Sequence, residues 1–91
     1  MKRVYVLINV KKGMADRVLR SLQNRAGVLM VDIVERPPDI IMVVQAANQE
    51  RLTRLTIEAL LPLEYLIEGL QLLPSHDRTM AYATPLNYRQ N

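Results

Sequence analysis

The stretch "VLMVDIVERPPDIIMVVQA", residues 28–46, decides the fold because it contains two apolar runs separated by a stiff polar turn. The first run, residues 28–35, is rich in β-branched residues, and so is the second, residues 39–46. Two adjacent prolines cannot donate to a strand ladder, and with the aspartate that follows they are typical of a turn. We therefore predict a β-hairpin with strands at 28–35 and 39–46.

The segment before the hairpin predicts one strand and one helix. Residues 4–10 alternate between two faces, with valine and isoleucine on one of them, which is strand periodicity. From Gly13 to Arg25, apolar residues recur at spacings of three and four, as they do on one side of a helix. Gly27 then offers a left-handed cap for the end of that helix.

The segment after the hairpin predicts a second helix and a fourth strand. Asn48 is a suitable N-cap for a helix with one leucine-rich stripe, and Pro62 is expected to stop it. Residues 65–73 then read as a strand. The residues after Pro74 show no sustained period. We therefore expect a single domain at 1–74 and a C-terminal tail at 75–91.

The resulting order β-α-β-β-α-β predicts an α+β, ferredoxin-like fold. In it a four-stranded antiparallel sheet has both helices on one face, and the first and third strands are central. Whichever alternate residues of the third strand face the helices, the other set is also apolar. Such a surface usually marks a contact, so we expect a homodimer in which two sheets pack face to face. The interface residues that we predict are Tyr5, Leu7, Met30, Ile41 and Val43.

Composition excludes several classes of function. The chain has no cysteine and one histidine, so we expect no metal and no cofactor. Its net charge of +3 comes from arginines spread along the chain rather than from a stripe that would follow a phosphate backbone. No run is long enough to span a membrane, and the apolar start lacks a cleavage site, so we expect a cytoplasmic protein without direct nucleic-acid or membrane binding.

Residues 3–73 resemble the effector-binding module, or RAM domain, of the Lrp/AsnC (leucine-responsive/asparagine-regulatory) transcription regulators. The likeness lies in a strand ending in "INVKKG", a helix ending in "RAGV", a hairpin ending in Asp before an apolar strand, and "LPLEYL" in place of an "IPGV"-like turn. The resemblance implies a dimeric α/β barrel, which some members assemble into rings of dimers. It also implies that an amino acid or a related small effector binds near the subunit interfaces.

Full-length members of that family read DNA with an N-terminal helix-turn-helix. Here the first strand begins at about residue 3, so we expect a stand-alone module without its own DNA-binding domain. Such a module would sense a metabolite or modulate transcription by co-assembling with a partner regulator. We expect no enzymatic step.

The family hairpin carries Gly-x-x-Asp, and "RPPD" places Asp39 at the aspartate and Arg36 at the glycine. This departure removes the backbone freedom of glycine, and the two prolines remove two N–H donors. In one interpretation Asp39 only caps the turn. In the other, Arg36 binds an effector carboxylate and Asp39 orients an ammonium group. Asp32, a carboxylate within an apolar strand, is expected to face an exposed sheet edge, and a ligand-binding role is the alternative for it.

Other interpretations stay open beside this one. His76 has no nucleophile or acid in motif spacing and is expected to be a surface residue, and Ser75, His76 and Asp77 are too close in sequence to form a triad. A small dimeric α/β-barrel enzyme, of the cofactor-free monooxygenase or isomerase type, would need polar groups such as Asn9, Asp32 and Tyr5 to converge. A peptide-binding chaperone would use the apolar sheet face. An RNA-binding role is disfavoured because the third strand has no aromatic residue.

Overall fold

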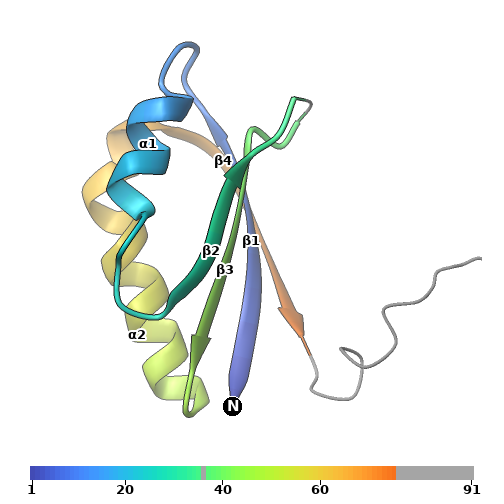
Figure 1. Cartoon of the computed structure of the whole chain (residues 1–91), viewed down its shortest axis with the longest axis vertical. Coiled ribbons are helices and arrows are strands. Elements are labelled where there is room, and N and C mark those ends of the chain that lie inside the picture. The colour runs from blue at the N-terminus through green and yellow to red at the C-terminus, as the bar shows by residue number, and fades with distance from the viewer. Residues whose placement is uncertain (36, 76–91) are drawn as a thin grey trace, which may run out of the picture.

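The structure is a computed structural model that describes residues 1–35 and 37–75. Its elements, in chain order, are β1 (Lys2–Val10), α1 (Ala15–Leu22), β2 (Val28–Ile33), β3 (Ile40–Ala46), α2 (Gln49–Leu60), the 3₁₀ helix η1 (Leu61–Leu66) and β4 (Ile67–Ser75). The four strands form one antiparallel sheet in the order β2-β3-β1-β4. Both helices lie on the same side of this sheet (Figure 1). The ferredoxin-like α+β fold, with its first and third strands central, is confirmed.

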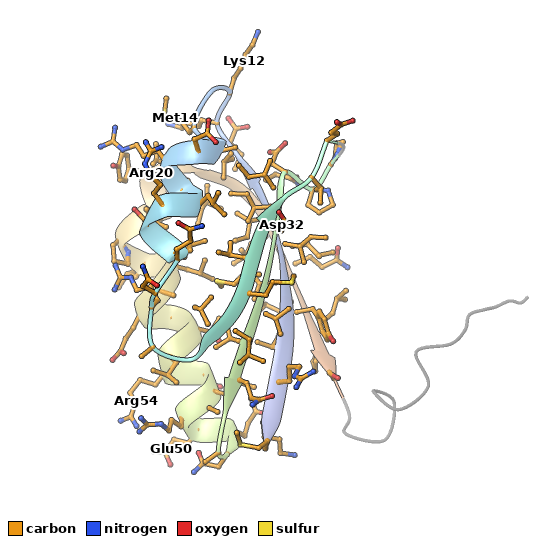
Figure 2. All side chains as sticks on the ribbon, in the orientation of Figure 1. Lys12, Met14, Arg20, Asp32, Glu50 and Arg54 are labelled. Carbon is orange, nitrogen blue, oxygen red and sulfur yellow. The ribbon has the colours of Figure 1, made fainter. Side chains whose placement is uncertain are left out.

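The hydrophobic core lies between the sheet and the two helices. Alternate residues of the central strands face the helices and are buried, namely Val4, Val6, Ile8 and Val10 of β1 and Ile40, Met42, Val44 and Ala46 of β3. Val18 and Leu22 of α1 and Leu52 and Ala59 of α2 meet them. Charged side chains such as Arg20, Glu50 and Arg54 lie on the outer side of the helices (Figure 2). In the described part of the chain, no helix is long and apolar enough to cross a membrane.

Local signals set the ends of α2. Asn48 is the N-cap, as predicted, and its Oδ1 accepts a hydrogen bond from the Arg51 N–H at 2.8 Å. The helix ends at Leu60, before Pro62, as predicted. The chain does not leave the helical region there, because Pro62 falls in the first turn of η1, where a missing N–H costs nothing. The fourth strand therefore begins at Ile67 rather than at Tyr65 and extends to Ser75.

The predicted end of α1 is wrong. The helix ends at Leu22 rather than near Arg25, and Asn24, with φ +70°, is the left-handed residue that follows it. Asparagine accepts this conformation more readily than most residues. Gly27, with φ +83°, instead forms the entry to β2, where its carbonyl accepts the Gln45 N–H at 2.8 Å. The first hairpin strand also ends earlier than predicted, at Ile33.

Gly27 lies where a side chain would collide. A Cβ built there would be 2.7 Å from Leu55 Cδ1 and 3.3 Å from the Gln45 carbonyl oxygen, whereas a Cβ on Gly13, at φ +81°, would meet nothing within 4 Å. Because both glycines have a positive φ, either substitution to alanine incurs the cost of a left-handed backbone, about 1–2 kcal/mol. Only the alanine at Gly27 would also collide with its neighbours. We expect Gly27→Ala to destabilise the fold more than Gly13→Ala, as measured by urea unfolding. Equal losses for the two variants would contradict this account.

Candidate functional site

The face of the sheet that the helices leave uncovered is organised in rows across the four strands. Its central row is entirely apolar and consists, from β2 to β4, of Met30, Val43, Tyr5 and Leu73. The next row towards the hairpin has polar residues at both edges and consists of Asp32, Ile41, Leu7 and Gln71. All five residues predicted for the dimer interface thus lie on one face and are direct neighbours.

The apolar band is bounded by polar residues at one end. Arg3 and Gln45 are partners in the strand register, and the Arg3 guanidinium donates to Gln45 Oε1 from Nε at 3.0 Å and from Nη2 at 2.6 Å. Within the band Val43 is only 6% exposed, whereas Met30 and Leu73 near the sheet edges are 47% and 41% exposed. The uncovered face is therefore apolar across its middle and exposed most strongly at its two outer strands.

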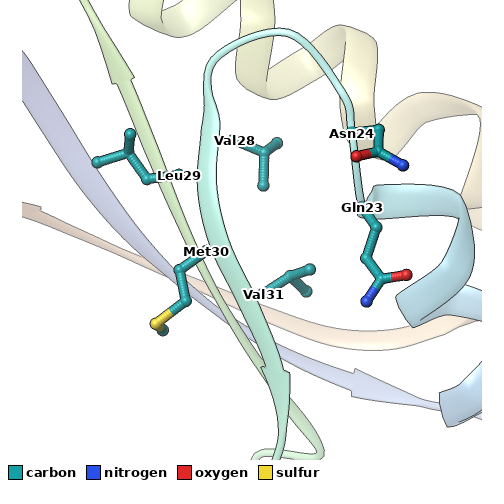
Figure 3. A pocket seen from close by; sticks show the side chains of 6 residues that line it. All are labelled: Gln23, Asn24, Val28, Leu29, Met30 and Val31. Atoms are coloured by element: carbon teal, nitrogen blue, oxygen red, sulfur yellow. The ribbon is translucent and has the colours of Figure 1, made fainter.

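An irregularity in β2 adds to this surface. The register shifts between Val28 and Met30, so that Leu29 has no partner of its own in β3. Leu29 and Met30 consequently point to the same side, away from α1, while Val28 and Val31 point towards the α1–β2 connection (Figure 3). Beside the strand lies an open hollow of about 530 Å³ lined also by Gln23 and Asn24. The strand pattern alone does not reveal that Leu29, 55% exposed, faces outward beside Met30.

A cleft forms where the hairpin meets β1 and β4. It has a volume of about 360 Å³, and it is lined by Leu7 and Asn9 of β1, Pro37 and Pro38 of the hairpin, and Leu70 and Gln71 of β4. Asn9 lies against Gly69, since a Cβ on that glycine would be 3.0 Å from Asn9 Nδ2. The cleft thus combines two carboxamides with apolar walls.

Asp39 holds the hairpin against β1. Its Oδ2 accepts the Val10 N–H at 2.9 Å, its own N–H donates to the Ile8 carbonyl at 2.9 Å, and its carbonyl accepts the Val34 N–H at 2.9 Å. The β1–β3 pairing ends at Ile8 and Ile40, so the carboxylate satisfies an N–H that lies just beyond the end of that ladder. Asp39 therefore has a backbone-satisfying role, although its partner belongs to a distant strand rather than to the turn itself.

Of the three predicted ligand-binding residues, the structure describes two, Asp32 and Asp39, and it does not bring these two together. Asp32 is exposed on the edge strand β2, while Asp39 lies at the hairpin end beside β1. Arg36, like His76 and Asp77, lies outside the described residues. Sequence reasoning missed Gln71, which lines the cleft beside the hairpin, and Gly69, which lies against Asn9. Asn9 was detectable, because it is the single polar residue in an otherwise apolar strand segment, residues 4–10, apart from the tyrosine.

Comparisons with known proteins bear on the fold. Neither a family model nor a curated protein sequence matches this chain. Solved structures do match: TTHA0845 from Thermus thermophilus has a TM-score of 0.74 at 22% identity, over 94% of this chain and 100% of that one. The structure called FFRP-DM1 has a TM-score of 0.73 at 17% identity, over 84% of this chain and 100% of that one.

A third similar structure is a transcriptional regulator, NMB0573 from Neisseria meningitidis, solved as a complex with L-Met. Its TM-score is 0.66 at 12% identity, and the match covers 84% of this chain but 50% of the regulator. The present chain thus corresponds to about half of that protein. All three matches are at 22% identity or below, so they show a shared fold and agree with the ferredoxin-like arrangement described above.

The contacts of Asp39 predict a defined pattern of stability. Asp39→Ala leaves the Val10 N–H without its acceptor, and loss of such a charge-assisted hydrogen bond costs about 1–3 kcal/mol. Asp39→Asn keeps an oxygen acceptor and should lose less. Asp32→Ala, on the exposed edge, should change the unfolding free energy by no more than about 0.5 kcal/mol. Urea unfolding of the three variants tests this order, and an Asp39→Ala variant as stable as the parent chain would contradict it.

Proposed function

We propose that this chain is a non-enzymatic module that forms a homodimer through the uncovered sheet face and binds a small effector, an amino acid or a related metabolite. The observation that carries the proposal is the apolar row Met30, Val43, Tyr5 and Leu73, which the fold leaves without a covering layer of helix. Apolar surface of this kind on a small domain usually marks a contact surface. Its twofold partner is a second copy of the same sheet, with the sheets about 10 Å apart.

The proposed effector site is the cleft at the hairpin end. Asn9 and Gln71 supply carboxamides that can bind a carboxylate or an amide, and their apolar neighbours Leu7 and Pro38 suit an aliphatic side chain. Asp39 follows Pro38 in the chain but does not itself line the cleft. Its Oδ2 accepts from Val10, and we assign its Oδ1 to a second donor, the ammonium of an amino acid. Arg36 is the proposed partner of the effector carboxylate.

The module would act as a regulator if binding of the effector changed how readily the homodimer forms. The cleft includes Leu7, which also belongs to the proposed interface, so a bound ligand contacts the surface on which the second copy packs. A ligand can shift an assembly equilibrium only by its difference in affinity for the two states. We propose that the module modulates transcription in this way through a partner regulator. The support is its structural likeness to proteins that include a transcriptional regulator.

The dimer is tested by placing a charge in the middle of the uncovered face. We expect the parent chain to elute as a dimer at micromolar concentration, and Leu7→Glu to elute as a folded monomer, because a carboxylate cannot be buried there without a partner. Size-exclusion chromatography with light scattering measures the mass. Tyr65→Glu is the matched control, since Tyr65 is 58% exposed on η1, away from this face, and should leave the dimer intact. A monomeric parent chain would overturn the proposal.

Effector binding is tested by thermal shift with the twenty amino acids and common metabolites. A ligand at a hundred times its dissociation constant should stabilise the folded state by about 2.7 kcal/mol. We expect Asp39→Asn, which keeps an acceptor for Val10 but loses the charge, to reduce the shift given by a ligand that carries an ammonium group. If no compound stabilises the parent chain, the effector-binding part of the proposal fails while the assembly part stands.

A further inference from the structure

A groove remains open on the helix side of the sheet, between α2 and β4. Two clefts of about 310 and 270 Å³ adjoin there, because both are lined by Thr56, Ile57 and Leu72. One continues to Leu60, Leu61 and Leu70, and the other to Leu52 and Pro74. The groove therefore runs along α2 and ends where β4 ends.

The leucines of β4 that line the groove face the core side of the sheet but are not fully covered. Leu70 and Leu72 pair with Ile8 and Val6, which are fully buried core residues, so they lie on the core side of the sheet. Nevertheless Leu70 is 48% and Leu72 50% exposed. On α2, Ile57 is 53% exposed beside them. This is core-facing apolar surface that lacks a neighbour on one side.

β4 is also an edge strand, since it pairs only with β1 in the sheet of the described residues. An edge of nine residues with exposed leucines is a template for pairing with another strand. A strand added to this edge would form backbone hydrogen bonds with β4, and every second side chain of it would fill the groove. One added strand would therefore occupy both the groove and the edge.

We propose that the occupant is residues 79–84 of the same chain, added to β4 as an antiparallel fifth strand. The chain leaves β4 at Ser75, next to Pro74, which lines the groove. A connection of three residues, His76 to Arg78, is within the common range for hairpins, and its aspartate is a turn former. The return strand then lies along α2, whose twelve residues extend about 18 Å at 1.5 Å per residue, the length of about six strand residues.

The sequence of this segment fits the two sides of the sheet. With a three-residue connection, Thr79 lies opposite Ser75, so Met80 lies opposite Pro74 and Tyr82 opposite Leu72 on the groove side. Ala81 and Ala83 then lie beside Leu73 and Gln71 on the uncovered face, where small side chains leave room for the proposed second sheet. Pro85 follows and lacks an N–H, which ends the pairing and protects the new edge.

Disulfide trapping tests both the occupant and its register, because the chain has no cysteine of its own. Directly opposite residues of antiparallel strands have Cα atoms about 4.5–5.5 Å apart. That separation falls within the range of about 4.4–6.8 Å that a disulfide accepts. The double variant Leu72→Cys/Tyr82→Cys should therefore oxidise to an intramolecular disulfide. The matched control, Leu72→Cys/Ala81→Cys, places the two sulfurs on opposite faces and should form far less.

The product's mass on a non-reducing gel distinguishes the possible occupants. A monomer containing the 72–82 disulfide supports the proposal. A disulfide-linked dimer of the 72–82 variant would assign the groove to the segment of another copy. A dimer of the single variant Leu72→Cys would assign the edge to β4 of another copy. Either dimer, or equal cross-linking in the control, would overturn the proposal.

A second measurement needs no substitution and so does not depend on the variants folding. In the full-length parent chain, every second amide of residues 79–84, those that donate to β4, should exchange with deuterium at least tenfold more slowly than the amides of residues 87–91, which lie beyond Pro85. Exchange of residues 79–84 at the rate of an unstructured peptide would overturn the proposal, whatever the ligand screen shows.

Discussion

Two short helices have to cover a sheet of four strands, and most of what the molecule can do follows from that shortage. Right-handed crossovers place α1 and α2 on the same side of the sheet. There they bury alternate residues of β1 and β3 so completely that Val6, Ile8, Ile40, Met42 and Val44 have no exposed surface. Within residues 1–35 and 37–75 no helix lies on the opposite face, and β4 is covered only in part on the helix side. A chain of 91 residues has little stability to spare, so association at each uncovered apolar surface would add to its stability.

The two uncovered surfaces differ in chemistry. The sheet face has an apolar row in its middle, with Gln45 bound to Arg3 at one end and Asn9 near the hairpin at the other. Such a layout suits a partner that is itself apolar in the centre and polar at the margins, as a second copy is. The groove beside α2 adjoins a strand edge, which suits one extended segment. The two contacts therefore do not compete for the same surface.

Features with a local cause were predictable from the sequence. The alternation of residues 4–10, the Asn48 cap and the order of elements depend on neighbours in the chain, and the structure confirms them. The end of α1 was not predictable in this way, because Asn24 adopts the left-handed conformation ahead of the more obvious Gly27. The register shifts in β2 and between β1 and β4 were also hidden, since they arise from pairing across the sheet. In the same way, the Asp39 contact to Val10 joins residues 29 apart, so the candidate site could be located near the hairpin but not assembled.

The hairpin with two prolines differs from the Gly-x-x-Asp hairpin of the family that the sequence resembles, because it offers fewer backbone N–H donors to a ligand. Pro37 and Pro38 supply no N–H, so the polar groups of the proposed effector would be bound in this cleft by side chains. The available ones, Asn9 and Gln71, belong to β1 and β4. Their positions depend on the register of these strands, which shifts at the residue that Asp39 holds. We therefore expect a change in the hairpin to alter the position of β4 as well. The cleft is formed jointly by the hairpin, the uncovered sheet face and the edge strand.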